Sequence, residues 1–148
     1  MADNPPSWPI IALDTNALVQ SIPTRGRFRP IIEGFDAGHF VLGVSNEILL
    51  EYEEILKAIG GPMAWSSFDS LLMARAAFVR RVDPTYYWEA IMHDPDDNKY
   101  VDAAVAGEAD WMVTEDSHYD VLFEDMRLTV RPLHPSLFID RFLQVKGG

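Results

Sequence analysis

The sequence contains no cysteine, few basic residues and no long apolar run. Without cysteine there are no disulfide bonds and no thiolate metal sites, which agrees with a reducing compartment. No apolar run approaches the roughly 20 residues that a membrane-spanning helix needs. The first ten residues, MADNPPSWPI, show no basic region followed by an apolar stretch, the pattern of a secretory signal. We therefore predict a cytoplasmic protein without a membrane segment.

Acidic residues outnumber basic ones: 23 Asp and Glu stand against 12 Lys and Arg, a formal net charge of -11. An acidic surface repels phosphate groups, so a passive nucleic-acid clamp is not expected. The argument changes if some of these acids bind a divalent metal ion, because the ion reverses the local charge and can itself contact a phosphate. Net charge therefore leaves a nucleic-acid substrate open.

The rest of the composition is that of a globular protein. The chain has 148 residues, 48% hydrophobic and 24% charged, enough to bury most of its apolar surface in one core. No repeat, low-complexity tract or linker divides it. We predict a single domain over residues 1–148, with its core at about 10–143 and flexible tails at 1–8 and 145–148.

Short apolar runs alternate with segments of helical periodicity. Strands are predicted at residues 10–13, 40–44, 111–113 and 128–130. Helices are predicted from Asn46 to Gly60-Gly61, from Pro62 onward, from about Pro95 to Gly107, after Asp116, and over HPSLFIDRFLQ at 134–144. This alternation predicts a three-layer α/β fold with a mainly parallel sheet.

Two acids lie just past predicted strands. Ligands of parallel sheets bind beyond the carboxyl ends of the strands, where Asp14 and Asp116 are expected. Asp14 is equally suited to cap a following helix, and one side chain can do both. Thr114 and Asp116 alternate with Glu115, so they face the same side if the extended conformation persists.

The helix after Ser45 carries four acids, which its geometry separates. At about 100° per residue, Glu51 lies about 80° from the centre of the apolar stripe formed by Ile48, Tyr52, Ile55 and Ile59. The other three acids, Glu47, Glu53 and Glu54, lie at roughly 120° or more. Glu51 is the acid that a cleft would reach, although a solvated helix face is the commoner position for a glutamate.

The same geometry separates the acids around residue 97. Asp94 is a suitable N-cap, and Asp96 and Asp97 then fall in the first helical turn, where the helix dipole favours negative charge. Asp97 shares a face with Val101, which should be core, so it is predicted to point toward the sheet. Asp102 lies about 140° around the helix and is predicted to be solvated.

Three segments in this order, LDTN, VSNEILLEYEEIL and DPDDNKYVDAAVAGEADWMVTED, resemble the PIN-domain family of metal-dependent ribonucleases. The resemblance is closest to its VapC-like branch, the toxin components of toxin–antitoxin pairs, and runs from about Ile10 to Leu143. It implies a PIN-like α/β/α domain with a parallel sheet of about five strands and acids at the carboxyl ends of the strands.

Carried over by position, the resemblance implies a catalytic and metal-binding site. Its acids are Asp14, Glu51, Asp97 and Asp116, and its supporting polar residues are Thr15, Asn16, Ser45 and Thr114. It implies Mg²⁺ or Mn²⁺ as cofactor and RNA as substrate, with an antitoxin or a second copy of the chain as partners. It leaves open the roles of Asp94, Asp96 and Asp120.

The chemistry agrees with such a site. Four carboxylates in one cleft repel each other and stay ionised together only with a cation present. Oxygen ligands suit Mg²⁺ or Mn²⁺ rather than zinc. Of the four histidines, His39, His93, His118 and His134, only His118 lies beside a candidate acid, and a surface or capping role is expected for each.

The alternative is a PIN-like module that binds RNA or protein without turnover, which the acidic surface favours. The aromatic residues Tyr86, Tyr87 and Trp88 then form a protein contact or pack in the core. The arginines at positions 25, 27 and 29 contact RNA phosphates or lie in a solvated loop. An aspartyl phosphatase is not supported, because LDTN lacks a second Asp two residues on.

Overall fold

The computed structural model describes residues 8–91 and 97–143. The predicted tails at 1–7 and 145–148, and the predicted helix start at Asp94-Pro95, lie outside the described residues. Trp8, which we placed in a tail, packs on Phe78 with ring centroids 4.6 Å apart. In the part of the chain described, no helix combines the length and the apolar character that crossing a membrane requires.

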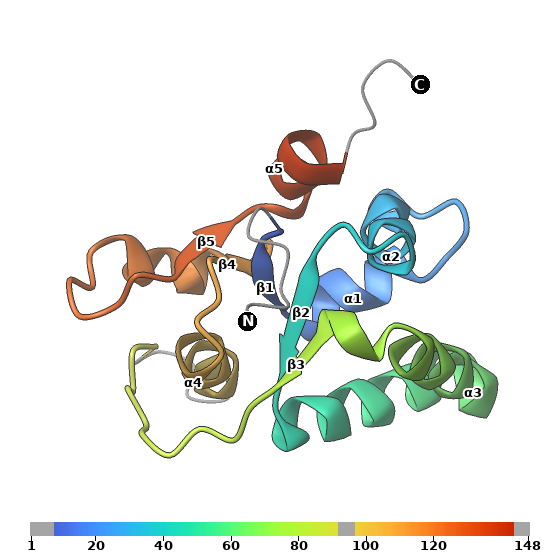
Figure 1. Cartoon of the computed structure of the whole chain (residues 1–148), viewed down its shortest axis with the longest axis horizontal. Coiled ribbons are helices and arrows are strands. Elements are labelled where there is room, and N and C mark those ends of the chain that lie inside the picture. Colours follow the sequence, from blue (N-terminus) through green and yellow to red (C-terminus); the bar gives the residue numbers. More distant parts are fainter. Residues whose placement is uncertain (1–7, 92–96, 144–148) are drawn as a thin grey trace.

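Five strands form one sheet in the order β3-β2-β1-β4-β5 (Figure 1). They are β1 (Ile10–Leu13), β2 (Val41–Val44), β3 (Val79–Arg81), β4 (Trp111–Val113) and β5 (Arg131–Leu133). Every neighbouring pair runs parallel. The predicted α/β class with a parallel five-stranded sheet is confirmed.

Helices cover both faces of the sheet. They are α1 (Thr15–Ser21), α2 (Arg29–Asp36), α3 (Asn46–Ala74), α4 (Asn98–Ala106) and α5 (Pro135–Phe138), with short turns η1 (Ala76–Phe78), η3 (Ser117–Phe123) and η4 (Ile139–Leu143). Figure 1 shows α1, α2 and α3 on one side of the sheet and α4 on the other. The chain moves along the sheet in one direction from β1 to β2 and β3, and in the other direction from β3 to β4 and β5. Because crossover connections between parallel strands are right-handed, this reversal places helices on opposite faces of the sheet.

Three predictions about individual elements were wrong. Helix α2 lies where a loop was expected around Arg29. No strand was predicted between the helix that begins at Pro62 and the helix near Pro95, but β3 begins there at Val79, and the last strand lies at 131–133 rather than 128–130. Strand β3 is short, carries two arginines and pairs only with β2 at the sheet edge, so its sequence lacks the apolar run that marks a central strand.

The chain turns back in the middle of α3. Gly61 has φ 76° and ψ -179°, so the element is two helical segments, and Pro62 begins the second. The predicted stop at Gly60-Gly61 is therefore correct at the level of the backbone. The predicted stripe is correct for Ile48 and Tyr52 but wrong for Ile59, which is exposed.

The sheet order places a crevice between the carboxyl ends of β1 and β4. From β1 the chain continues toward the β3 edge of the sheet, and from β4 toward the β5 edge. Ligands of open α/β sheets bind at such a switch point, where the strand order reverses. Asp14 and Thr114 are the first residues beyond these two strands. The Asp14 amide donates to the Val113 carbonyl at 3.2 Å, which fixes the two strand ends side by side.

Candidate functional site

One pocket beyond these strand ends brings the four predicted acids together. Its volume is about 180 Å³, and it is lined by Asp14, Thr15, Asn16, Glu51, Ile55, Asp97, Tyr100 and Asp116. The acids come from four places in the fold: the end of β1, helix α3, the start of α4, and the loop after β4. Their convergence is a structural fact, and their catalytic role stays a prediction.

Asp14 lies deepest, with 7% of its surface exposed. One carboxylate oxygen, Oδ1, accepts the Ala17 amide at 2.8 Å and caps α1, while Oδ2 accepts the Thr114 hydroxyl. Burial raises the pKa of Asp14, these two hydrogen bonds act against that rise, and nearby Asp116 adds to it. Both roles considered for Asp14, helix cap and site acid, are therefore compatible in one side chain.

The loop after β4 alternates as predicted. The Asp116 amide donates to Thr114 Oγ1 at 2.9 Å, Asp116 lines the pocket of the four acids, and the Thr114 hydroxyl reaches Asp14 there although Thr114 itself does not line the pocket. Glu115 points elsewhere and pairs with Arg27 at 2.6 Å. Thr114 thus links Asp14 to Asp116 across the strand ends.

Glu51 reaches the pocket from α3 and has donors on both oxygens. The Lys99 ammonium lies 2.7 Å from Oε1. The hydroxyls of Thr15, at 2.5 Å, and of Tyr100 donate to Oε2. Partial burial acts to raise the pKa of Glu51, but the hydrogen bonds from Lys99, Thr15 and Tyr100 outweigh it and hold the pKa below its ordinary value.

Asp97 and Asp116 face a third potential ligand, His118. One ligand atom from each of these three side chains lies within 4.8 Å of the other two. Asp97 precedes α4 without capping it through its side chain. Buried Tyr119 lies behind this group: desolvation, and then the charges of Asp97 and Asp14, raise the pKa of its hydroxyl.

The donor set fits a divalent cation. Two carboxylates and an imidazole meet within 4.8 Å, and the pocket that contains both carboxylates also contains Asp14 and Glu51. Carboxylate oxygens are the usual protein ligands of Mg²⁺ and Mn²⁺, and they form the larger part of this donor set. The residues present are therefore suited to such an ion.

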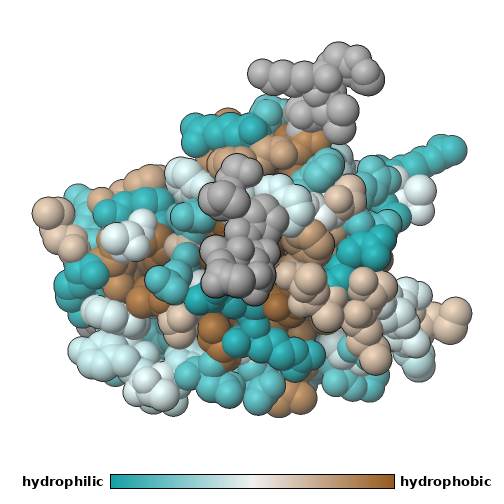
Figure 2. All heavy atoms as spheres, viewed as in Figure 1, coloured by the Kyte–Doolittle hydropathy of each residue, from teal (hydrophilic) through white to brown (hydrophobic). Residues whose placement is uncertain are grey.

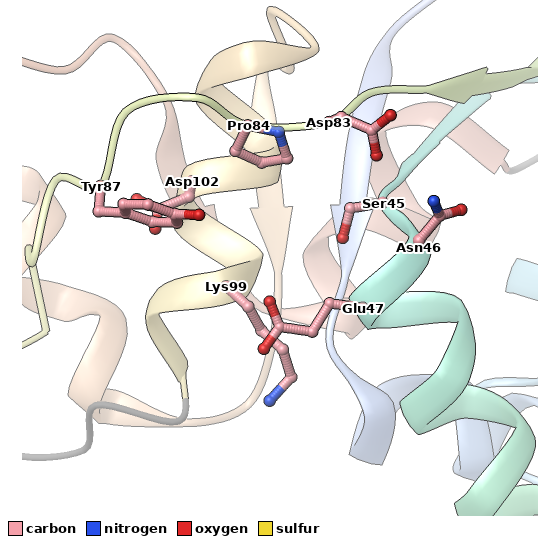
Figure 3. Close-up of a pocket in the computed structure, with 8 residues that line it drawn as sticks. All are labelled: Ser45, Asn46, Glu47, Asp83, Pro84, Tyr87, Lys99 and Asp102. Atoms are coloured by element: carbon pink, nitrogen blue, oxygen red, sulfur yellow. The ribbon is translucent and has the colours of Figure 1, made fainter.

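Ser45, expected beside the metal, does not line this pocket. It caps α3, with Oγ accepting the Ile48 amide at 3.2 Å. It lines a neighbouring cavity of about 230 Å³ with Asn46, Glu47, Asp83, Pro84, Tyr87, Lys99 and Asp102 (Figure 3). Thr15 and Asn16 do line the acid pocket, and Asp120 lines a third cavity beside Asp116.

Asp102, predicted to be solvated, is buried with 5% of its surface exposed. The loop between β3 and α4 crosses over it, and one Asp102 carboxylate oxygen accepts the Trp88 amide at 2.9 Å. The prediction that Asp102 is solvated was wrong, because a segment outside the helix, around Trp88, covers it. The prediction failed because helix geometry does not show what packs on a helix.

Other side chains named from the sequence have local partners. Arg27 pairs with Glu115, and Arg29 donates to the Ile22 carbonyl at 2.5 Å. His134 caps α5, and capping was one of the two roles, surface or cap, expected for the histidines. Tyr86 and Tyr87 are exposed, so the core-packing alternative does not apply to these two.

Sequence reasoning missed three residues at the site. Tyr100 lines the pocket, Lys99 pairs with Glu51, and His118 lies with Asp97 and Asp116. The only signal for His118 was its place two residues after Asp116. Lys99 and Tyr100 act across the gap between α4 and α3, which no local pattern shows.

Fold and site together define a parallel α/β domain with an acidic pocket at its switch point. The PIN-domain profile matches residues 11–118, and the chain belongs to the PIN-domain family, whose members are generally nucleases. No curated protein matches the sequence significantly.

Two of the solved structures that resemble this chain illustrate the shared fold. One is VapBC2 from Rickettsia felis bound to a DNA fragment from their promoter, with 17% identity and a TM-score of 0.56, covering 84% of this chain and 98% of that one. The other is FitAcB from Neisseria gonorrhoeae, with 15% identity and a TM-score of 0.53, covering 85% and 98%. At these identities the likeness concerns the fold alone.

Proposed function

We propose that the protein is a metal-dependent ribonuclease that hydrolyses phosphodiester bonds in RNA. The observation that carries the proposal is the meeting of Asp14, Glu51, Asp97 and Asp116 in one pocket at the switch point of the sheet. Scattered solubilising charge has no reason to converge there. Membership of a family that generally consists of nucleases gives the convergence its chemical meaning.

Asp14, Asp97 and Asp116 are the proposed holders of Mg²⁺ or Mn²⁺, with His118 within reach and Glu51 completing the site. These residues would hold the ion, which would supply positive charge opposite the scissile phosphate and make water more acidic there. The Thr114 hydroxyl orients two of these residues, because it donates to the Asp14 carboxylate and accepts the Asp116 amide. By resemblance, the products carry a 5′-phosphate and a 3′-hydroxyl.

The protein is further proposed to act as the toxin of a cytoplasmic toxin–antitoxin pair. Support comes from the VapC-like sequence motifs and from the fold shared with VapBC2 and FitAcB. An antitoxin is the proposed protein partner, and a homodimer is a second proposed assembly. Sequencing the DNA on both sides of this gene, co-expressing any small reading frame found there, and size-exclusion chromatography of the product test the first assembly.

The experiment incubates the purified chain with single-stranded and structured RNA and Mn²⁺. The wild type should cleave, chelator should stop cleavage, and Asp14→Asn should lower the rate about 100-fold or more, as loss of a preorganised charge at a reaction centre does. The matched control is Asp140→Asn, which removes an exposed acid from η4 and should cleave normally. Cleavage that survives both chelator and Asp14→Asn would exclude this pocket as the active site.

The second candidate is a module that binds RNA or protein without turnover. The net charge of -11 and the exposed Tyr86 and Tyr87 favour it. It predicts that RNA or a protein partner binds while no RNA is cut under any metal condition. The same incubation, read by gel shift as well as by cleavage, separates the two functions.

A further inference from the structure

The feature that the proposed function leaves unexplained is a lysine among the acids. Lys99 lies on α4 two residues after Asp97, and its side chain is only 13% exposed. In Figure 3 it extends from α4 into the gap facing the start of α3, with its ammonium directed away from Asp83 and Pro84. The ammonium ends 2.7 Å from Glu51 Oε1.

Glu51 is thereby engaged on both sides. Lys99 holds Oε1, and the hydroxyls of Thr15 and Tyr100 donate to Oε2. A divalent cation approaching Glu51 would meet the positive Lys99 ammonium 2.7 Å from Oε1, which repels a second cation, whereas the donors to Asp14 are neutral groups. The group made by Asp97, Asp116 and His118, in contrast, offers converging ligand atoms without Glu51.

We propose that Lys99 occupies the place of a second metal ion: its ammonium neutralises Glu51, so the site holds one divalent cation between Asp14, Asp97 and Asp116, with His118 beside it. This inference rests on the proposed function. Lys99 provides, as a covalently attached charge, what a second ion provides in two-metal phosphodiesterases, where the ions lie about 3.5–4 Å apart. Glu51 is then a positioning residue that orients Lys99, rather than the metal ligand implied by the resemblance.

The test counts bound Mn²⁺ on the full, metal-stripped chain by calorimetry and by electron paramagnetic resonance of the free ion. The wild type should bind one Mn²⁺ per chain. Lys99→Met removes the charge while keeping a long side chain, and should bind a second Mn²⁺ at the released Glu51. Lys57→Met is the matched control, because Lys57 forms an exposed ion pair with Glu53 on α3, and it should bind one.

A second pair of variants keeps the test decisive if Lys99→Met fails to fold. Glu51→Gln should change the Mn²⁺ dissociation constant less than about threefold, whereas Asp97→Asn should weaken binding by about tenfold or more, as changes within or next to a coordination shell do. Two ions in the wild type, one in folded Lys99→Met, or a tenfold loss in Glu51→Gln would each overturn the inference while leaving the ribonuclease proposal intact. Absence of any Mn²⁺ binding by the wild type would overturn both.

Discussion

At the residue scale, hydroxyl groups connect the acids of the pocket. Thr114 donates to Asp14 and accepts the Asp116 amide, while Thr15 and Tyr100 donate to Glu51. Each hydroxyl stabilises a charged carboxylate and fixes its direction. The carboxylates of Asp14 and Glu51 are therefore held in place before any cation or substrate arrives.

Replacing Thr114 tests this role. In Thr114→Val the Asp14 carboxylate loses its hydroxyl donor and the Asp116 amide loses its hydroxyl acceptor. Mn²⁺ binding should weaken about 10- to 100-fold, as on loss of an outer-shell partner. The substitution should also destabilise the fold by about 1–3 kcal/mol, because two buried polar groups lose a partner. Thr114→Ser keeps the hydroxyl and is the control. Titration with Mn²⁺ and thermal unfolding of both variants measure the two effects, and equal affinities would contradict the assigned role.

Asp102 predicts a dependence of stability on pH. Burial raises its pKa above the ordinary value of 3.8, the Trp88 amide acts against the rise, and the charges of Glu47 and Glu89 add to it. A raised folded-state pKa gives stability that is fully present below the unfolded value and is lost as pH rises through the folded value. Ionised Asp102 therefore lowers the stability of the protein at neutral pH.

Asp102→Asn keeps an acceptor for the Trp88 amide and removes the charge. Its melting temperature should exceed that of the wild type at neutral pH, and the difference should shrink toward about pH 4, near the ordinary carboxyl pKa. Asp102→Ala, which loses the acceptor, should be destabilised by about 1–3 kcal/mol throughout. Thermal melts from neutral pH to about pH 4 measure these differences. A gap in melting temperature between Asp102→Asn and the wild type that grows on acidification would refute the raised pKa of Asp102.

At the scale of elements, the reversal inside α3 links Glu51 to the sheet edge. The first half of α3 carries Ser45 as its cap and Glu51 into the pocket, and the second half returns toward β3. Tyr52 and Phe68 pack between the halves with ring centroids 6.0 Å apart. The turn at Gly61 therefore allows one continuous segment to serve both site and core.

Gly61→Ala should destabilise the fold by about 1–3 kcal/mol, because φ 76° with ψ -179° is a region that only glycine adopts without strain. The cost should come from the backbone alone, since an added Cβ meets nothing within 4 Å. The control is Ser67→Ala, an exposed change on the second half of α3, which should be neutral within about 0.5 kcal/mol. Urea denaturation measures both, and a neutral Gly61→Ala would show that the turn relaxes.

At the scale of the whole molecule, the acidic side chains are unevenly distributed. Figure 2 shows hydrophobic residues in scattered groups among hydrophilic ones on the displayed face, as on an ordinary protein surface. Four of the 23 acidic side chains meet in one pocket of about 180 Å³. Folding brings these charges together, so a cation that binds only the folded site should stabilise the whole domain.

Mn²⁺ should therefore raise the melting temperature in proportion to the logarithm of its concentration. At about 100 times the dissociation constant the gain is about 2.7 kcal/mol for a single site. The variant Asp97→Asn should lose about half of this gain or more, whereas Asp140→Asn should keep it. Differential scanning fluorimetry over a Mn²⁺ series provides the measurement, and an equal shift in both variants would place the ion elsewhere.

The amino-acid order already contained the alternation of strands and helices, the fold class and the helical phase of Glu51. These depend on local geometry: about 3.6 residues per helical turn, short apolar runs for buried strands, and glycine where a helix reverses. For the same reason the edge strand β3, with two arginines and a single neighbour, escaped detection.

Only the tertiary structure decided that Lys99 pairs with Glu51, that His118 joins Asp97 and Asp116, and that a loop buries Asp102. Each of these contacts joins segments distant in sequence or depends on how a loop bends after a strand. Their distances are set by how helices pack on the sheet, which no local periodicity encodes. The four acids could therefore be predicted from the sequence, but the lysine that neutralises one of them, Lys99, could not.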